Sequence, residues 1–269
     1  MKRHKLTTLF LALFVCSISY SGELTVSSLN AYFCFSPDYP AGSLKNTPRP
    51  ETQEEYVRKI SNLSTLVNTS SIVGLQEVEK QSVADLATEL KFKQAFVKGR
   101  DTYTAQDVGI LVSPNVTLSS HGRVKELDKL VTKHLLVKVK LSDGTKVNIL
   151  NVHLIRPIGE AATKHAAQLG VIQTWAETLI SQGENLIVMG DFNATGKELL
   201  GAQFRDAINE VPSAKTGLFG KALDHIYVSP SITIKTVQIK QPPYGKKPND
   251  LNKRLWTDHF AVTAVVDVK

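Results

Sequence analysis

The sequence predicts an α/β unit in which two β-sheets pack together and helices cover the outer faces. Two observations favour this architecture. Short apolar runs rich in β-branched residues recur along the whole chain, which is typical of strands. Only a few segments have the spacing of apolar side chains that is typical of an amphipathic helix. Many strands and few helices, with no repeat or low-complexity linker between them, indicate one α/β domain.

The expected strands are apolar runs of five to nine residues. Lys138 and Lys140 alternate with apolar residues in one of them, so that strand should have one solvated face. Asp143-Gly144 lies between two runs and is typical of a hairpin turn. The runs cover residues 24–29, 71–75, 108–112, 135–141, 147–152, 185–189, 223–228, 232–239 and 260–268.

Three segments have helical spacing. In 51–67, Ile60, Leu63 and Val67 lie three or four residues apart, and Glu54 and Glu55 in the first turn favour the positive end of the helix dipole. A second amphipathic segment covers 159–180, and a shorter one covers 82–90.

The first residues have the pattern of a secretory signal peptide. Lys2, Arg3 and Lys5 form a positive start, an apolar run over 6–18 follows, and small residues flank Ser21. The run is too short for a transmembrane helix, which needs roughly 20 apolar residues. We therefore predict a signal peptide over 1–21, a single domain over 22–269, and a protein that is secreted or periplasmic, with no stable membrane span.

Composition narrows the class further. A content of 42% hydrophobic and 21% charged residues is that of a globular chain and excludes intrinsic disorder. The formal net charge of +7 favours a polyanionic partner, although signal-peptide cleavage lowers it by three, to +4. Cleavage also leaves Cys34 as the remaining cysteine, so no internal disulfide can form. We interpret Cys34 as a buried thiol, since no histidine lies near it in the sequence.

Polar residues follow directly after several expected strands, where a rigid scaffold can present chemistry. Asp191 and Asn193 lie two residues apart, so both can face one pocket, and Gly190 permits close backbone approach. Glu77 and Asn30 offer the same oxygen ligands, which suit Mg²⁺. The sequence contains no Cys-x-x-Cys pair, which argues against a structural zinc site. Each of these residues alone has another interpretation: an asparagine at a strand end can form a turn, and an acid can be a solvated loop residue. A single histidine in such a position can equally be a buried structural residue.

The order of these residues resembles the endonuclease/exonuclease/phosphatase superfamily. The blocks that carry the resemblance are Asn30, Gln76-Glu77, His153, Gly190-Asp191-Phe192-Asn193, Asp224-His225 and Thr257-Asp258-His259. The resemblance extends over residues 24–268. It implies the deoxyribonuclease I-like fold, a four-layer α-β-β-α sandwich of two packed, mostly antiparallel sheets.

The resemblance also implies a metal-binding pair and the groups that prepare attack on phosphorus. Glu77 and Asn30 correspond to ligands of Mg²⁺, with Mn²⁺ or Ca²⁺ as substitutes. Asp191 would orient or deprotonate the attacking water, and Asn193 would contact the phosphate. Asp258 would complete the polar cluster on the metal side.

Two histidines complete the implied machinery. His259 would lie beside the scissile phosphate, held by the carboxylate of Asp224, and His153 would stabilise charge on the phosphate oxygens. In the family, an acid pairs with the histidine at the position of His153. Asp107 is the nearest candidate for that acid in this sequence. Arg156 falls where some relatives have a phosphate-contacting arginine, and a solvated loop charge is the alternative.

Basic residues gather just before the Asp258-His259 pair. They are Lys240, Lys246, Lys247, Lys253 and Arg254, with Tyr244 and Trp256 between them. Basic groups interleaved with aromatic rings suit a nucleic-acid backbone and its bases. Lys98 and Arg100 in another expected loop favour the same partner. A solvated lysine-rich loop is the alternative interpretation.

These observations predict an exported, monomeric Mg²⁺-dependent phosphodiesterase, an endonuclease that hydrolyses DNA by attack of water on phosphorus. No apolar hairpin suited to a bilayer is evident, and residues 194–196 lack the arginine that inositol phosphatases of the family carry there. A sphingomyelinase-like or other phosphodiesterase or phosphatase is the alternative. An inactive module that binds polyanions is a third possibility.

Overall fold

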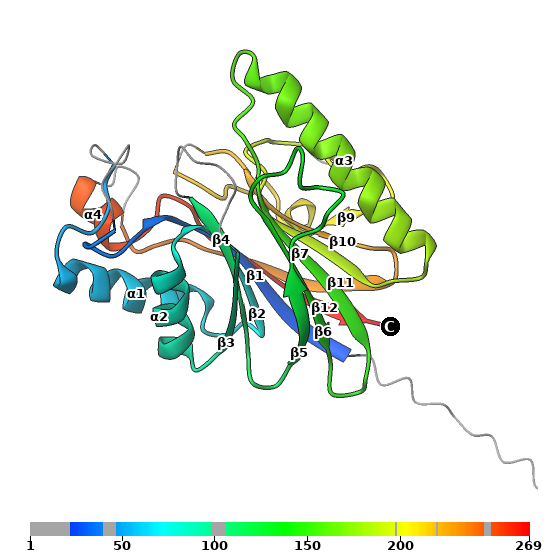
Figure 1. Cartoon of the computed structure of the whole chain (residues 1–269), viewed down its shortest axis with the longest axis horizontal. Helices are drawn as coiled ribbons and strands as arrows, with labels where there is room; N and C mark the ends of the chain where they lie inside the picture. Colours follow the sequence, from blue (N-terminus) through cyan, green and yellow to red (C-terminus); the bar gives the residue numbers. More distant parts are fainter. Residues whose placement is uncertain (1–21, 40–46, 98–105, 197, 219, 245–248) are drawn as a thin grey trace, which may run out of the picture.

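The computed structural model describes residues 22–269 apart from 40–46, 98–105, 197, 219 and 245–248. Two six-stranded sheets pack face to face, with α1 and α2 against one outer face and α3 against the other (Figure 1). The predicted α/β sandwich is therefore confirmed. The elements, in chain order, are β1 (Gly22–Cys34), α1 (Gln53–Val67), β2 (Ile72–Val78), α2 (Lys80–Leu90), β3 (Lys93–Val97), β4 (Asp107–Val112), β5 (Thr117–Gly122), β6 (His134–Lys140), β7 (Lys146–His153), α3 (Ala161–Ser181), β8 (Leu186–Asp191), β9 (Arg205–Asp206), the 3-10 helix η2 (Ala207–Glu210), β10 (Asp224–Val228), β11 (Ile232–Lys240), α4 (Asp250–Leu255) and β12 (Ala261–Val268).

The two sheets share one topological feature, a parallel pair near the middle of a mostly antiparallel sheet. The first sheet has the strand order β11-β12-β1-β2-β4-β3, and the second β5-β6-β7-β8-β10-β9. β1 runs parallel to β2, and β7 runs parallel to β8. Parallel neighbours need a crossover connection, which α1 and α3 supply. The carboxyl ends of each parallel pair consequently meet at one sheet edge.

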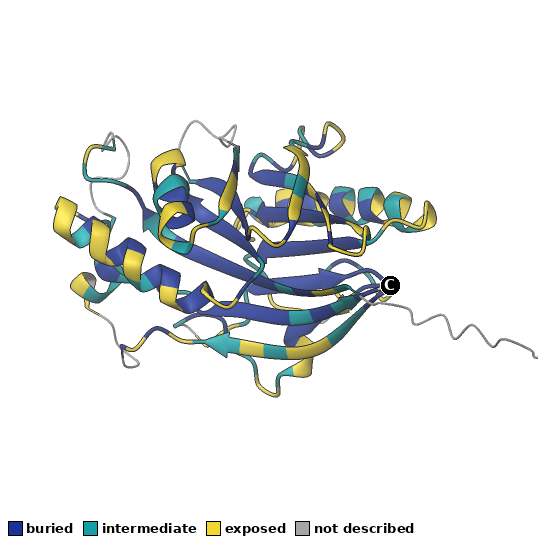
Figure 2. Ribbon diagram, turned by 90° about the horizontal axis from the view of Figure 1, so that it is seen from below, coloured by how far each residue is buried: buried dark blue, intermediate teal, exposed yellow. Residues whose placement is uncertain are grey.

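Three apolar layers hold the sandwich together. The central layer lies between the sheets and includes Val26, Ile149 and Ile187, which are fully buried. A second layer joins α1 and α2 to the first sheet, and a third joins α3 to the second sheet. Figure 2 shows buried strands inside and helices whose outer faces are exposed. Burial of this apolar surface on both faces of each sheet is the main force that stabilises the fold.

A polar link joins the two sheets within the central layer. The side chain of Gln76 on β2 donates to Asn151 Oδ1 on β7 at 2.6 Å. Asn151 Nδ2 donates in turn to the carbonyls of Leu75 and Gly109, both at 2.9 Å. Both side chains are fully buried, so the pairing is strongly favoured over leaving either amide unsatisfied. The link fixes one sheet against the other just below the ends of β2 and β7.

Several elements were absent from the sequence prediction. β3, β5 and the two-residue β9 lack the long apolar runs used to find the other strands. The predicted loop near residue 250 contains the short helix α4, which begins after Asn249 because its side chain accepts from the amide of Asn252 at 2.8 Å. Asn62 of α1 donates to the carbonyl of Leu255 at 2.8 Å and holds α4 against α1.

The N-terminal segment 1–21 lies outside the described residues, so the signal peptide stays a prediction. Within the part of the chain that the structure covers, no helix has the length and apolar character needed to cross a bilayer. Cys34 is fully buried as a free thiol, and burial raises its pKa to about 12.

Gly190 is the position where the backbone of β8 most needs the absence of a side chain. Its φ is +143°, and a Cβ atom there would lie 1.9 Å from the carbonyl oxygen of Val152 on β7. Neither the Cβ atom nor the Val152 carbonyl oxygen can move away, because β7 and β8 are paired by backbone hydrogen bonds in the middle of the sheet.

We predict that Gly190→Ala lowers the free energy of unfolding by at least about 3 kcal/mol, since the methyl group meets backbone and the φ value disfavours any Cβ. Chemical denaturation measures the change. Gly170→Ala is the matched control: a Cβ at Gly170 meets nothing within 4 Å on α3. It should raise stability by about 0.5–1 kcal/mol. A Gly190→Ala protein as stable as the wild type would contradict the packing described.

Candidate active site

The carboxyl ends of the two parallel pairs bring four polar residues to one place. Asn30 is the last residue of β1 before its register with β2 shifts, and Glu77 lies beside it on β2. His153 pairs with Asp191 across β7 and β8. Asp224 faces Asp191 from the start of β10. Each sheet therefore contributes half of the site, and all of these side chains are buried.

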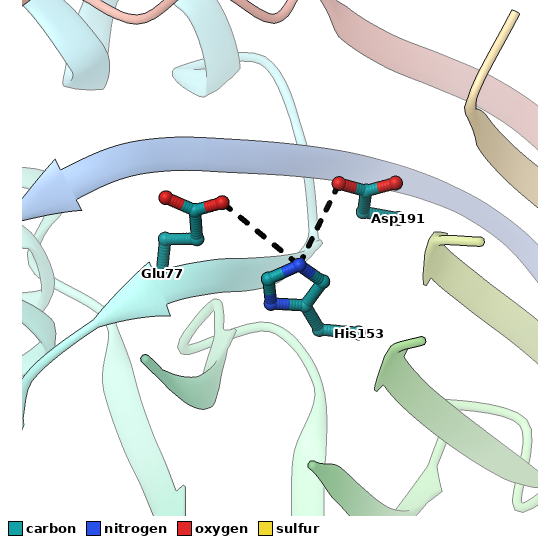
Figure 3. Close-up of side chains that lie close together, drawn as sticks. All are labelled: Glu77, His153 and Asp191. Carbon is teal, nitrogen blue, oxygen red and sulfur yellow. Dashed lines mark ion pairs between the residues drawn. The ribbon is translucent and has the colours of Figure 1, made fainter. Parts of the chain in front are cut away.

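Glu77, His153 and Asp191 converge from three strands (Figure 3). The Nε2 atom of His153 lies 3.8 Å from Glu77 Oε1 and 3.7 Å from Asp191 Oδ2. Asn30 Nδ2 donates to the same two carboxylates, at 3.0 Å to each. The amide oxygen of Asn30 accepts instead from the backbone amide of Tyr32 at 2.9 Å. Asn30 thus joins the two acids through its nitrogen.

A histidine–aspartate pair forms the opposite side of the cluster. His259 Nδ1 donates to Asp224 Oδ2 at 2.8 Å. This fixes the imidazole so that Nε2 faces Asp191 Oδ2 at 3.8 Å and Asp258 Oδ1 at 3.9 Å. The amide of His259 also donates to Thr257 Oγ1 at 3.1 Å. The predicted association of His259 with Asp224 is present in the structure.

Asn193 lies at the edge of the cluster in a strained backbone conformation. Its φ is 51°, in the left-handed region, and its amide donates to Asp191 Oδ1 at 2.8 Å. Its Nδ2 donates to the carbonyl of Leu154 at 2.9 Å. Two buried histidines hold the neighbouring carbonyls: His165 Nε2 contacts Phe192 O at 2.8 Å, and His225 Nε2 contacts Ala194 O at 3.0 Å.

Burial and charge perturb the acids and the histidines in opposite directions. Burial raises the pKa of Glu77 above its usual range and raises the pKa of Asp191 to about 7. Burial also disfavours charge on His259, but Asp224 and the other nearby carboxylates outweigh it and raise its pKa well above the ordinary value. Burial, Lys133 and His259 together lower the pKa of His153. These shifts favour the charged form of His259 and the neutral form of His153.

A cavity of about 600 Å³ opens over this cluster. Seven of the predicted residues line it: Glu77, His153, Arg156, Asp191, Asn193, Asp258 and His259. Asn30 and Asp224 do not line the cavity and hold the lining side chains from behind. Further residues line the cavity that the sequence did not assign to the site: Tyr32, Phe33, Gln106, Lys133, Leu154, Ile155 and Leu223.

The donor set fits a divalent cation. One ligand atom from each of Glu77, His153 and Asp191 lies within 4.8 Å of the others, and Asp191, Asp224 and His259 form a second such group. Within the described part of the chain, neither Glu77 nor Asp191 has an ion pair with a lysine or arginine. Two ionised carboxylates buried side by side lower the stability of the fold unless nearby positive charge offsets them. Carboxylate oxygens suit a hard cation such as Mg²⁺.

Some predicted contacts are not found. His153 Nδ1 has no hydrogen-bond partner among the described residues, so its pairing with Asp107 is absent. Asp107 starts β4 and lines a separate cavity of about 640 Å³ with Tyr39 and His121. No acid in the described part of the chain hydrogen-bonds His153 Nδ1 to oppose the lowering of its pKa by burial, Lys133 and His259.

The basic segment before His259 also differs from expectation. Arg254 pairs with Glu51 at 2.5 Å and Glu55 at 3.4 Å, so it fastens α4 to the start of α1 and does not line the cavity. Tyr244 is buried, with 8% of its surface exposed, and cannot offer a stacking face. Lys253 does not line the cavity either. Lys246, Lys247, Lys98 and Arg100 lie outside the described residues. Among the described residues, the lysine and arginine side chains that line the cavity are Lys133 and Arg156.

The fold and this cluster define a protein of the deoxyribonuclease I-like class. A family model described as the Endonuclease/Exonuclease/phosphatase family matches residues 27–243. The chain belongs to this family, whose members are typically metal-dependent phosphoester hydrolases. No curated protein sequence matches the chain.

Solved structures share the fold at low sequence identity. TDP2 from C. elegans superposes with a TM-score of 0.62 at 19% identity, covering 92% of this chain and 75% of that one. The human Nocturnin catalytic domain with a bound sulfate anion gives 0.67 at 16% identity, with coverages of 92% and 94%. D. rerio TDP2 complexed with a single-strand DNA product gives 0.63 at 18% identity, with coverages of 91% and 98%.

We predict that millimolar Mg²⁺ raises the thermal midpoint of the wild-type protein, because a ligand that binds the folded state stabilises it. Glu77→Gln should abolish this increment. In cation-free buffer the same variant should be at least as stable as the wild type, since it removes a buried charge yet keeps an oxygen that can accept from Asn30. Differential scanning calorimetry with Mg²⁺ or EDTA measures both effects.

Glu126→Gln, which changes an exposed acid, is the control and should keep the full increment. A Glu77→Gln protein that Mg²⁺ stabilises as much as the wild type would show that the cation binds elsewhere.

Proposed function

We propose that the protein is a Mg²⁺-dependent phosphodiesterase, and that its substrate is DNA, cut as an endonuclease by attack of water on phosphorus. The observation that carries the proposal is the convergence of Glu77, Asp191, His153 and the His259–Asp224 pair on one cavity. Family membership supports hydrolysis of a phosphoester.

Each side chain has a role that its environment supports. The cation, held by Glu77 and Asp191 when bound, would neutralise charge on the phosphate oxygens. Asp191 lies where it can accept a hydrogen bond from the attacking water, with Asn193 fixed beside it by the hydrogen bond to Asp191 Oδ1. His259, charged and oriented by Asp224, would donate from Nε2 to a phosphate oxygen as negative charge develops there. His153 would contribute a neutral donor from the second sheet.

The cations at the cavity wall support a polyanionic substrate. Lys133, just before β6, and Arg156, just after β7, line the cavity, and Lys133 Nζ donates to Gln106 Oε1 at 2.9 Å. Arg156 is exposed and lies three residues after His153. Phosphate neutralisation by such groups provides much of the affinity for nucleic acid. The D. rerio neighbour with single-strand DNA product also supports this substrate class.

We further propose that the protein acts after export, as a secreted or periplasmic monomer. The charged start and short apolar run over 1–21 support export. Detection of the protein in the periplasmic or culture fraction, with an N-terminus near residue 22, tests this proposal.

A second candidate is hydrolysis of a phosphodiester that carries an apolar group, as in a phospholipid such as sphingomyelin. Ile155 lines the cavity and is 40% exposed, and Ile158 is 68% exposed in the same loop. Exposed apolar side chains beside a phosphate site suit an apolar substituent.

Incubation of the purified protein with supercoiled plasmid DNA, with Mg²⁺ or EDTA, tests the proposed function. We predict nicking with Mg²⁺ and none with EDTA. His259→Ala should lower the rate about 10²-fold or more. His121→Ala, an exposed histidine outside the cavity over the site, should keep the wild-type rate. Turnover of sphingomyelin or of a phosphomonoester without any nicking would overturn the nuclease proposal.

We also predict that Arg156→Ala raises KM for DNA about 3- to 10-fold and reduces the dependence of KM on salt, because one phosphate contact is lost. Arg58→Ala removes an exposed arginine on α1, away from the cavity, and should change neither quantity. Equal effects in the two variants would mean that Arg156 acts only through overall charge.

A further inference from the structure

Lys59 is a fully buried lysine on α1, and the proposed reaction does not use it. Its Nζ donates to the carbonyl of Tyr32 at 2.6 Å and to the carbonyl of Lys253 at 3.2 Å, and it lies 5.8 Å from the centre of the Tyr32 ring. Burial lowers its pKa to about 8. A buried ammonium is costly and persists only where its contacts compensate for lost hydration.

The first contact of Lys59 lies in a strained part of the backbone. Tyr32 and Phe33 have φ values of 48° and 50°, so two consecutive non-glycine residues are in the left-handed region. The register of β1 against β2 shifts at this point. A non-glycine residue in this region is disfavoured and needs surrounding contacts to hold it. The ammonium of Lys59 on the Tyr32 carbonyl is such a contact.

The strained backbone contacts both sequence-predicted cation ligands of the first sheet. The amide of Phe33 donates to Glu77 Oε2 at 3.3 Å, and the amide of Tyr32 donates to Asn30 Oδ1 at 2.9 Å. Asn30 Nδ2 in turn joins Glu77 to Asp191. The orientation of this carboxylate therefore depends on the conformation of residues 32–33.

The second contact of Lys59 is with the segment that leads to His259. Lys253 is in α4, which leads directly into Thr257 and His259. Thr257 Oγ1 donates to the carbonyl of Asn30 at 2.6 Å. One buried ammonium thus holds the backbone on both sides of the Asn30 end of the site.

We propose that Lys59 is a positioning residue for the cation site: its ammonium holds Tyr32 and Phe33 in the left-handed conformation that aims their amides at Asn30 and Glu77. This inference rests on the proposed cation site at Glu77 and Asp191. It concerns cation affinity and does not require that DNA is the substrate.

Removal of the Lys59 ammonium should change the cation affinity in opposite directions under two explanations, a purely electrostatic effect and a positioning effect. Lys59→Met deletes a positive charge near Glu77, which by itself would strengthen cation binding. If Lys59 positions the ligands, the same change should weaken binding about 10-fold or more, as loss of groups that orient ligands does. The direction of the change thus separates the two effects.

The test is calorimetric titration of Mn²⁺ into the purified, cation-free protein, which needs no substrate. We expect Lys59→Met to bind Mn²⁺ about 10-fold more weakly than the wild type. Adding Tyr32→Gly to Lys59→Met should restore at least about 3-fold of the lost affinity, because glycine adopts the left-handed conformation without strain. A residue that only stabilised the fold would give no such rescue.

Asn62→Ala is the matched control. Asn62 lies on the same helix and donates to α4 at Leu255 O, but it has no hydrogen bond to residues 32–33. Its Mn²⁺ affinity should stay within about 2-fold of the wild type. Should Lys59→Met fail to fold, Lys59→Gln, with and without Tyr32→Gly, gives the same comparison.

Unchanged or tighter Mn²⁺ binding in the Lys59 variant overturns the inference, as does an equal loss in Asn62→Ala or a loss that Tyr32→Gly does not reverse. Wild-type protein that binds Mn²⁺ but cleaves no DNA would contradict the proposed nuclease activity without contradicting the proposed role of Lys59.

Discussion

The structure depends on one electrostatic constraint: several carboxylates are buried together where two sheets meet. Glu77, Asp191 and Asp224 are all buried, and burial raises the pKa of Glu77 and of Asp191. His259 hydrogen-bonds Asp224 directly and lies 3.8 Å from Asp191, whereas the donor that Glu77 and Asp191 share is the neutral amide of Asn30. A divalent cation bound between Glu77 and Asp191 would offset this negative charge, so a cluster that destabilises the cation-free protein fits a cation site.

The backbone is arranged to hold that unfavourable cluster in place. The parallel pairs β1–β2 and β7–β8 bring their carboxyl ends to one edge, and the buried Gln76–Asn151 hydrogen bond fixes one pair against the other. Left-handed residues at Glu77 and Asn193 turn the chain at the strand ends. Strain and buried charge both cost stability, and both lie within a few residues of the proposed chemistry, as expected where function competes with folding.

The sequence was sufficient for most of the strands and for the polar residues that gather at their ends, because both depend on local patterns. β-branched runs located strands such as β7 and β8, and acids or histidines directly after them located Glu77, His153 and Asp191. It was not sufficient where the outcome depends on contacts between distant segments. Arg254 resembled a substrate contact in a basic run, but Glu51 and Glu55, some 200 residues earlier, hold it. Tyr32, Gln106 and Lys133 line the cavity only because β1, β4 and β6 meet there, and nothing in their local sequence shows it.

The central claim is that a divalent cation binds between Glu77 and Asp191. Anomalous diffraction from crystals soaked in Mn²⁺ tests it most directly, because the signal locates the ion without reference to activity. The account predicts a Mn²⁺ peak in contact with the carboxylate oxygens of Glu77 and Asp191, with His259 still paired to Asp224. No peak at that position, or a single peak held by Asp224 and His259 in its place, would contradict it.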